Sequence, residues 1–389
     1  AAAMSLAPFI GEKEKPIPNQ YIVVLLANSD LDSHMASMKQ NLLLDNESNE
    51  ILHKYTIGDF KGYGVRCTDA AILAIRASDD VKYVEQDNYV QAFATQNNPP
   101  SWGLDRTSQR NLPLTNTYVY NDNAGSGVEM YTIDTGIYIS HSDFGGRAVW
   151  GITVPSGSSN DDKNGHGTHC SGTMAGTSYG IAKKASLTAV KVLNDFGFGS
   201  NNDVIAGVNW VADKYSAGKK IVANMSLGGG ASTALDSAVN AAVDKGCHFV
   251  TAAGNDNANS CNYSPGRAAN AINVCSTDSR DAKSSFSNWG TCVDICAPGS
   301  SITSAWIGSS NASRTISGTS MAAPHVAGVV ALWLGYQSLT PTQMKNQIQS
   351  ESTKNVISGL PSGTVNYLLY NDPPCRSEER RIGKQCKSP

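Results

Sequence analysis

The feature that most constrains the fold is a regular alternation of short apolar runs and helical stretches between residues 128 and 334. Apolar runs of strand length cover 128–133, 187–193, 221–226, 248–252 and 272–276, and helical spacing covers 166–176, 201–214, 233–245 and 320–334. This alternation predicts an α/β unit with a parallel sheet flanked by helices on both faces. In such sheets, site residues lie at the carboxyl ends of strands and at the following helix starts.

The segment before this unit has a different pattern. Strand-like runs at 21–26, 51–57, 62–67 and 81–90 surround helical stretches at 31–44 and 70–77. The resulting β-α-β-β-α-β order is the ferredoxin-like pattern. The chain of 389 residues is long enough for both units, so we expect a small α+β domain followed by a larger α/β domain.

Composition excludes several classes of protein. Hydrophobic residues make up 40% and charged residues 16%, which supports a packed core, and the formal net charge is −3. That charge gives no reason to expect a nucleic acid or an anionic membrane as partner. No apolar run reaches the roughly 20 residues that a membrane span needs. Nine cysteines suit an oxidising compartment, although an odd number cannot all pair within the chain.

Three short motifs supply an aspartate, a histidine and a serine at the expected places. Asp134 lies in Asp-Thr-Gly and ends a predicted strand, whereas His166 in His-Gly-Thr-His and Ser320 in Gly-Thr-Ser-Met-Ala-Ala-Pro-His open predicted helices. A serine hydroxyl needs a base to become a nucleophile. We interpret His166 as that base, Asp134 as the group that orients it, and Ser320 as the nucleophile.

Each motif taken alone has another interpretation. Aspartic proteases also carry Asp-Thr-Gly but need a second such carboxylate, and the chain has no second copy. His166, His169 and Cys170 could be metal ligands, yet a zinc site needs a further partner and a different spacing. An α/β-hydrolase needs a histidine well after its serine. The only later histidine, His325, follows Ser320 by five positions in the same helix and is badly placed as a base.

The order Asp, His, Ser is that of subtilisin. From about residue 102 to residue 370 the chain resembles the subtilase family, and within it the proteinase K and aqualysin group. The preceding unit resembles the inhibitor-type prodomain of that family, with 84–87 at the position of its final strand. The resemblance implies a secreted, monomeric serine endopeptidase that acts on proteins and peptides and is made as a self-processing proenzyme.

The resemblance also implies a division of the chain. We expect an N-terminal extension at 1–17 that could hold a signal-peptide remnant, a prodomain at 18–93, a catalytic domain at 94–370 and a polar tail at 371–389. The patternless segment 92–101 reads as a linker, and processing is expected at Phe93-Ala94 or Ala94-Thr95. The prodomain should assist folding and then act as an intramolecular inhibitor.

Further site residues rest on the same resemblance. Asn255 matches the asparagine that stabilises the oxyanion, together with the backbone N–H of Ser320. Two backbone edges are expected to hold the substrate as an added strand, and they comprise Gly197, Phe198, Gly199, Ser226, Leu227, Gly228 and Gly254. Kexin-like relatives place carboxylates near this segment, and this chain does not, so we expect broad specificity with an apolar or aromatic P1 residue. The alternative is a non-catalytic regulatory or binding protein on this scaffold, marked by loss of a site residue.

Calcium and disulfides are implied in the same way. Asp294, with the backbone carbonyls of Ile272 and Val274, aligns with a structural calcium site of the family, so Ca²⁺ is the expected cofactor. Cys261 and Cys292 resemble a disulfide pair of aqualysin-like enzymes. Cysteines on apolar strands are expected to be buried thiols, and these are Cys247, Cys275 and Cys296. Cys170 resembles the free thiol that some relatives carry beneath the histidine.

Overall fold

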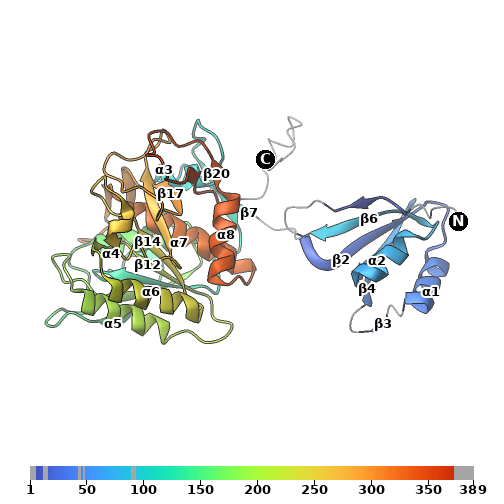
Figure 1. The fold of residues 1–389 in the computed structure, drawn as a ribbon, viewed down its shortest axis with the longest axis horizontal. Coiled ribbons are helices and arrows are strands. Elements are labelled where there is room, and N and C mark those ends of the chain that lie inside the picture. The colour runs from blue at the N-terminus through green and yellow to red at the C-terminus, as the bar shows by residue number, and fades with distance from the viewer. Residues whose placement is uncertain (1–5, 12–15, 43–44, 47–48, 89–92, 372–389) are drawn as a thin grey trace. The chain divides into compact units, whose positions relative to one another are not determined.

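The computed structural model describes residues 6–11, 16–42, 45–46, 49–88 and 93–371 (Figure 1). Contacts within the chain separate two compact units, at residues 1–91 and 92–389. Cys375 and Cys386, and the rest of the expected C-terminal tail beyond residue 371, lie outside the described residues, as does the start of the expected N-terminal extension.

The smaller unit is one sheet with two helices. Its elements are β1 (Phe9–Ile10), β2 (Pro16–Leu25), α1 (Leu31–Leu42), β3 (Asp45–Asn46), β4 (Asn49–Ile57), β5 (Phe60–Arg66), α2 (Asp69–Arg76) and β6 (Val81–Asn88). The strand order is β1-β6-β2-β5-β4-β3, and β2 lies antiparallel to both β5 and β6. Apolar side chains of α1 and α2 pack on the sheet around the buried residues Val23 and Val84. The ferredoxin-like prediction is confirmed.

Part of the expected N-terminal extension belongs to this sheet. Strand β1 runs parallel to β6, and the Ala7 N–H donates to the Arg76 carbonyl. Strand β2 begins at Pro16, so the expected boundary at residue 18 falls inside a strand. The pattern of the sequence missed β1 because two residues are too few to show a period.

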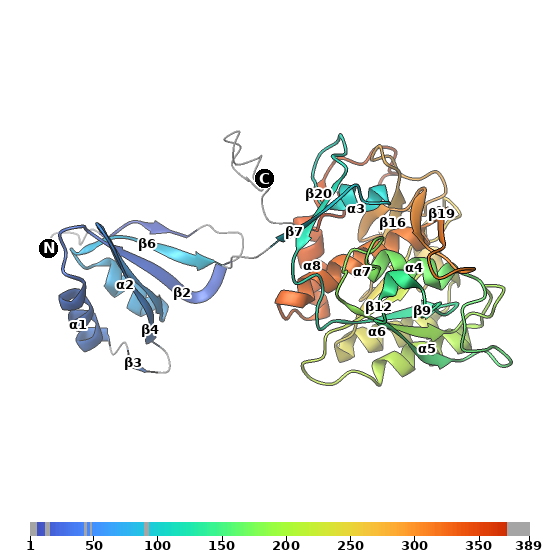
Figure 2. The ribbon, with the colours of Figure 1, turned by 180° about the vertical axis from the view of Figure 1, so that it is seen from behind.

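The larger unit is built on a nine-stranded sheet, ordered β10-β11-β9-β12-β14-β16-β17-β21-β20. Figure 2 shows β9, β12 and β16 of this sheet among the helices that surround it. Its strands are β9 (Glu129–Asp134), β10 (Ala148–Thr153), β11 (Ser186–Lys191), β12 (Ile221–Met225), β14 (His248–Ala252), β16 (Ile272–Thr277), β17 (Ile295–Pro298), β20 (Thr353–Lys354) and β21 (Tyr367–Leu368). All neighbouring pairs are parallel except β20 with β21. The parallel α/β prediction is therefore confirmed.

Helices cover both faces of this sheet. They are α3 (Trp102–Thr107), α4 (His166–Ala175), α5 (Asn201–Ala212), α6 (Thr233–Lys245), α7 (Thr319–Tyr336) and α8 (Pro341–Glu351). Side chains alternate along β9, so Met130 packs with α4 and α7 on one face, whereas Tyr131 and Ile133 pack with α5 and α6 on the other. Helix α7 is apolar on every side and almost completely buried, as a central helix should be.

Short strands and turns outside the main sheet complete this unit. These are the pair β7 (Phe93–Asn97) and β8 (Thr117–Asn121), the pair β13 (Gly229–Gly230) and β15 (Tyr263–Ser264), the hairpin β18 (Ile302–Ala305) and β19 (Ser313–Ile316), and 3₁₀ turns at Ser142–Phe144 and Ser260–Asn262. Strand β7 corrects the expectation of a patternless linker at 92–101. Its polar residues form a strand because β8 supplies the hydrogen-bonding partner.

Candidate active site

The aspartate and the histidine of the predicted triad meet at the carboxyl end of the sheet. Asp134 is the last residue of β9 and is fully buried, and His166 is the first residue of α4. The His166 Nδ1 lies 2.8 Å from Asp134 Oδ1 and 3.0 Å from Oδ2. The Thr135 N–H also donates to Asp134 Oδ1, at 2.7 Å. The carboxylate is therefore held and can fix the tautomer of the ring.

This pairing changes the charge state of the ring. Burial of His166 works against its charged form, but the adjacent Asp134 and Cys170 together outweigh burial and raise the pKa of His166 well above its ordinary value of 6.5. The His166 side chain remains 26% exposed, so a substrate and water can reach it. The ring is thus a strong base when neutral and a stabilised cation after it accepts a proton.

A second buried carboxylate holds the two motifs together. Asp162, which is 2% exposed, accepts hydrogen bonds from Thr135 Oγ1 at 2.9 Å, from the Gly165 N–H at 2.9 Å, and from the N–H and hydroxyl of Thr168. Thr135 Oγ1 accepts in turn from the Gly167 N–H. Asp162 therefore joins the end of β9 to the start of α4. Nothing in the local sequence distinguished this aspartate from a solvated loop residue.

The proline of the serine motif explains how Ser320 is held. Pro324 lies inside α7 and has no N–H, so the Ser320 carbonyl four residues earlier lacks its helical partner. That carbonyl accepts instead from Ser226 Oγ at 2.8 Å and from Cys170 Sγ at 3.3 Å. The Ser320 hydroxyl donates to the Ser226 carbonyl at 3.1 Å. Ser320 is thus bonded to Ser226, the residue after β12, and to Cys170 of α4.

The structure brings together two of the three residues considered as metal ligands, His166 and Cys170, but not His169. Ligand atoms of Asp134, His166 and Cys170 lie within 4.8 Å of one another, but His169 is turned away and its Nε2 lies 3.1 Å from the carbonyls of Ile302 and Arg314. Burial lowers the pKa of His169 to about 4, so it stays neutral. Burial also raises the pKa of Cys170, which keeps a neutral thiol rather than the thiolate a metal needs.

Asn255 follows β14 and lies beside the start of α7. Its Oδ1 accepts from the Thr319 N–H at 2.8 Å and from Thr319 Oγ1 at 2.9 Å. Thr319 Oγ1 also accepts from the Gly254 N–H. With Oδ1 engaged in both bonds, the exposed Nδ2 group is the end that can donate to a substrate. Thr319 was not singled out in the sequence, and it orients the amide.

We predict that Asn255→Ala lowers kcat about 10²–10³-fold with little change in KM, because a donor to the oxyanion acts only in the transition state. Hydrolysis of a chromogenic peptide measures both constants. Asn255→Asp keeps the acceptor for Thr319 and should lose kcat as well, whereas Asn209→Ala on the exposed side of α5 should not. A rise in KM at constant kcat would instead assign Asn255 to substrate binding.

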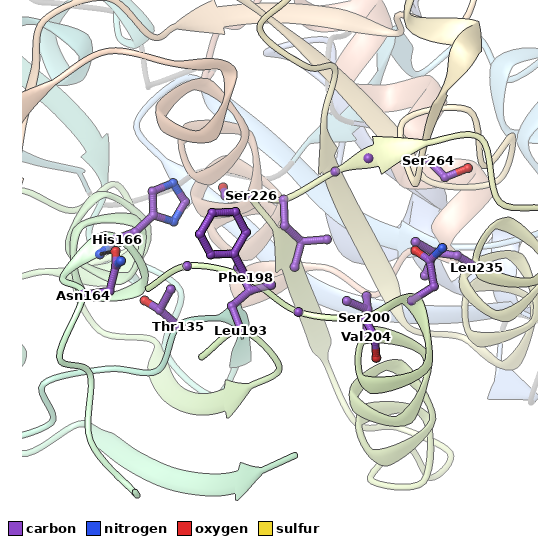
Figure 3. A pocket seen from close by; sticks show the side chains of 16 residues that line it. Thr135, Asn164, His166, Leu193, Phe198, Ser200, Val204, Ser226, Leu235 and Ser264 are labelled. Atoms are coloured by element: carbon purple, nitrogen blue, oxygen red, sulfur yellow. Dashed lines mark hydrogen bonds between the residues drawn. The ribbon is translucent and has the colours of Figure 1, made fainter. Parts of the chain in front are cut away.

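A pocket next to His166 contains most of the expected substrate-binding residues (Figure 3). Its labelled side chains run from Asn164 and His166 at one end to Leu235 and Ser264 at the other. Gly197, Phe198, Gly199, Ser226, Leu227 and Gly228 all line it. None of its lining residues is an aspartate, glutamate, lysine or arginine. The Phe198 side chain is 73% exposed and is therefore available to cover a bound chain.

Gly254 does not line this pocket, although we had grouped it with the binding residues. It has φ +104, and an added Cβ would come 2.3 Å from the Asn288 side chain. Asn288 Oδ1 accepts from the Asp256 and Ala258 N–H groups and so shapes the turn that carries Asn255. Glycine is required here by both its backbone conformation and its close neighbour.

The cysteines agree only in part with expectation. Cys261 and Cys292 form a disulfide, the pair that the resemblance implied, and Cys247 is a buried thiol as expected. Cys275 and Cys296, expected to be thiols, form a second disulfide. The prediction was wrong because these residues lie directly opposite one another on β16 and β17, with Cα atoms 4.4 Å apart.

The residues of the expected calcium site do not fit that ion. Asp294 Oδ1 accepts from Lys345 Nζ at 2.9 Å, and Oδ2 accepts from the Asn273 N–H at 2.9 Å. The Val274 carbonyl accepts from the N–H of Ala253, the residue after β14, and Ile272 is a buried residue of the same strand β16. Ca²⁺ takes six to eight oxygen ligands, waters included. Subtilases commonly bind structural calcium, but here an ammonium and one backbone N–H already engage this carboxylate.

Comparison with known proteins agrees with this geometry. Residues 125–366 match the subtilase family, and residues 20–93 match the peptidase inhibitor I9 family. An extracellular serine proteinase of Thermus sp. is 45% identical over 95% of this chain and 94% of its own length. Subtilisin-like protease 2 of Pseudogymnoascus destructans is 46% identical over 91% of this chain and 90% of its own.

The fold also matches that of a solved structure. The crystal structure of a cold-adapted subtilisin-like serine proteinase matches with a TM-score of 0.66 and 51% identity, over 69% of this chain and 97% of that one. No described helix has both the length and the apolar character of a membrane span. Loss of a triad or oxyanion residue would mark a non-catalytic relative, and this chain has all four: Asp134, His166, Asn255 and Ser320. The chain therefore belongs to the subtilase family of serine endopeptidases and carries an I9 inhibitor prodomain before its catalytic domain.

Proposed function

We propose that this endopeptidase works through Asp134, His166 and Ser320 and an acyl-enzyme intermediate. The observation that carries the proposal is the buried Asp134 carboxylate bound through both oxygens to His166 Nδ1. This leaves Nε2 as the nitrogen that can accept the serine proton. Ser320 Oγ donates to the Ser226 carbonyl in the structure, and we infer that rotation about its Cα–Cβ bond turns it toward that nitrogen when substrate binds.

The reaction then follows from the positions of these groups. The Ser320 Oγ proton passes to His166 Nε2 as Oγ bonds to the peptide carbonyl carbon. The carbonyl oxygen becomes an oxyanion, stabilised by Asn255 Nδ2 and the Ser320 N–H at the positive end of α7. The C–N bond breaks as His166 returns its proton to the leaving amine. Water repeats the sequence on the ester and releases the acid and Ser320.

The substrate is proposed to bind as an extended strand between residues 197–199 and 226–228. Gly197 has φ +83, which L-residues with side chains rarely adopt, and Gly228 leaves its backbone open to close approach. Main-chain hydrogen bonds along such edges give affinity without requiring one sequence. Because no aspartate, glutamate, lysine or arginine lines the pocket, selectivity should favour apolar residues.

Cleavage profiling tests this proposal. With a peptide library varied at P1, we expect kcat/KM for aromatic and large aliphatic residues to exceed that for lysine and arginine by at least 10-fold, because a charged group would lose its solvation in the cleft without a partner. The same assay with a serine-reactive fluorophosphonate should label Ser320. Strict preference for basic P1 residues would contradict the specificity, whereas hydrolysis without serine labelling would contradict the mechanism.

Self-processing is proposed at residues 93–95, with the prodomain acting as an intramolecular inhibitor. The I9 match supports the inhibitor role of the prodomain expected at 18–93, and residues 9–10 and 16–17 belong to the same sheet. In the structure Phe93, Ala94 and Thr95 pair with β8. Because a substrate strand must lie in the cleft, we infer that this segment leaves β8 during processing and that only its part after the cut pairs with β8 again.

Secretion is proposed for the mature enzyme. The Thermus relative is an extracellular proteinase by name, and two disulfides in the catalytic unit suit an oxidising compartment.

A further inference from the structure

A lysine from the last long helix reaches the carboxylate that family resemblance assigned to calcium. Lys345 lies in α8, and its Nζ donates to Asp294 Oδ1 at 2.9 Å. The same Nζ donates to the carbonyls of Ala269 and Ala271, each at 2.9 Å. Three oxygens therefore surround one ammonium, which satisfies all three of its N–H groups.

The surroundings make this a built site rather than a surface pair. The Lys345 and Asp294 side chains are only 21% and 17% exposed. Asp294 Oδ2 accepts from the Asn273 N–H, and Gln349, one turn after Lys345, donates to the Asp294 carbonyl at 3.2 Å. Helix α8 thus holds the turn before β17 through two side chains spaced four residues apart.

We propose that Lys345 supplies the positive charge at Asp294, so that this chain stabilises the turn before β17 with its own ammonium and binds no calcium there. The two cations exclude one another. Calcium binds oxygen at 2.3–2.6 Å, so an ion on Asp294 Oδ1 would lie within about 5.5 Å of Lys345 Nζ. Both side chains are largely buried, and like charges repel strongly where solvent screening is weak. Calcium would also have to compete with the donors on Oδ2 and on the Val274 carbonyl.

The Asp294 carboxylate is largely buried, so its charge needs a partner. Burial raises the pKa of Asp294, and the Lys345 ammonium and the Asn273 N–H work against that rise. Loss of Lys345 would leave a largely buried carboxylate without its cation, which is the costly way to break an ion pair. The site therefore predicts a stability effect that does not depend on calcium.

Thermal unfolding of the full chain tests the proposal, in a Ser320→Ala background to prevent autolysis. In EDTA we expect Lys345→Met and Asp294→Asn each to lower Tm by roughly 3–6 °C. The double variant should lose little more than either single variant, because both remove the same interaction. The Asp294→Asn loss should be the same in EDTA and in millimolar CaCl₂, even where calcium raises Tm through other sites.

The matched control is Lys219→Met, which removes an exposed ion pair with Glu129 and should change Tm by no more than about 1 °C. Additive losses from Lys345→Met and Asp294→Asn would overturn the proposal, since the two groups would then act independently. An Asp294→Asn loss that appears only with calcium would also overturn it.

Counting calcium gives a readout that does not depend on stability. Isothermal titration of the same Ser320→Ala chain with CaCl₂ should give the same number of sites before and after Asp294→Asn. One site fewer in the Asp294→Asn chain would show that calcium displaces Lys345 and binds there. Lys345→Arg, which keeps the charge in a different shape, provides a folded variant for the titration if Lys345→Met does not accumulate.

Discussion

Replacing Ser320 with alanine is expected to lower kcat by about 10⁶-fold, which is the loss that follows removal of the nucleophilic serine in subtilisin. The alanine has no atom that can bond to the peptide carbonyl, whereas the remaining residues keep their contacts. The Ser320 backbone carbonyl, bound by Ser226 and Cys170, does not depend on the side chain that is removed. Peptide hydrolysis under saturating substrate measures the loss.

The same variant should also remain at full length. Wild type should lose its first 93 or 94 residues by intact mass, because the proposed self-processing cuts at Phe93-Ala94 or Ala94-Thr95. The control is Ser350→Ala, which removes an exposed hydroxyl on α8 and should process and cleave like wild type. If Ser320→Ala were processed and active, another residue would be the nucleophile. If it were processed but inactive, a separate protease would make the cut.

Replacing Asp134 with asparagine is expected to lower kcat about 10⁴-fold at neutral pH. The amide keeps nearly the same shape, so the fold should persist, but its NH₂ group favours the wrong tautomer of His166. The stabilisation of the imidazolium by a buried carboxylate is lost as well. Asp213→Asn, which neutralises an exposed carboxylate beside Lys245, is the control and should leave kcat unchanged.

The pH profile separates this effect from misfolding. Catalysis needs neutral His166, so kcat/KM should rise as pH increases through the pKa of His166 and be lost below it. Asp134 raises that pKa in the natural chain. Asp134→Asn should therefore move the acid limb of the profile to lower pH while the plateau falls. An acid limb that stays in place would show that a group other than His166 controls it.

Strong local patterns predicted most of the fold. The prediction for α6 and for β14 matched at both ends, and β9, β11, β12 and β16 matched within a few residues, because their apolar periods arise from packing on both faces of one sheet. Helix α8 was missed because only Met344 and Ile348 of its side chains are buried. Strand β7 was missed because its polar residues are ordered by β8 rather than by a core.

By itself, the sequence determined the fold class and the two units, and it was enough to propose Asp134, His166, Ser320 and Asn255 as site residues, because each lies in a motif at the end of a strongly patterned element. Only the tertiary structure decided which residues far away in the sequence form contacts with one another. Asp162 and Thr319 hold the site, Cys275 bonds to Cys296, and Lys345 reaches Asp294. Such contacts join residues with no shared local pattern, and they arise from where the packed sheet and helices place each side chain.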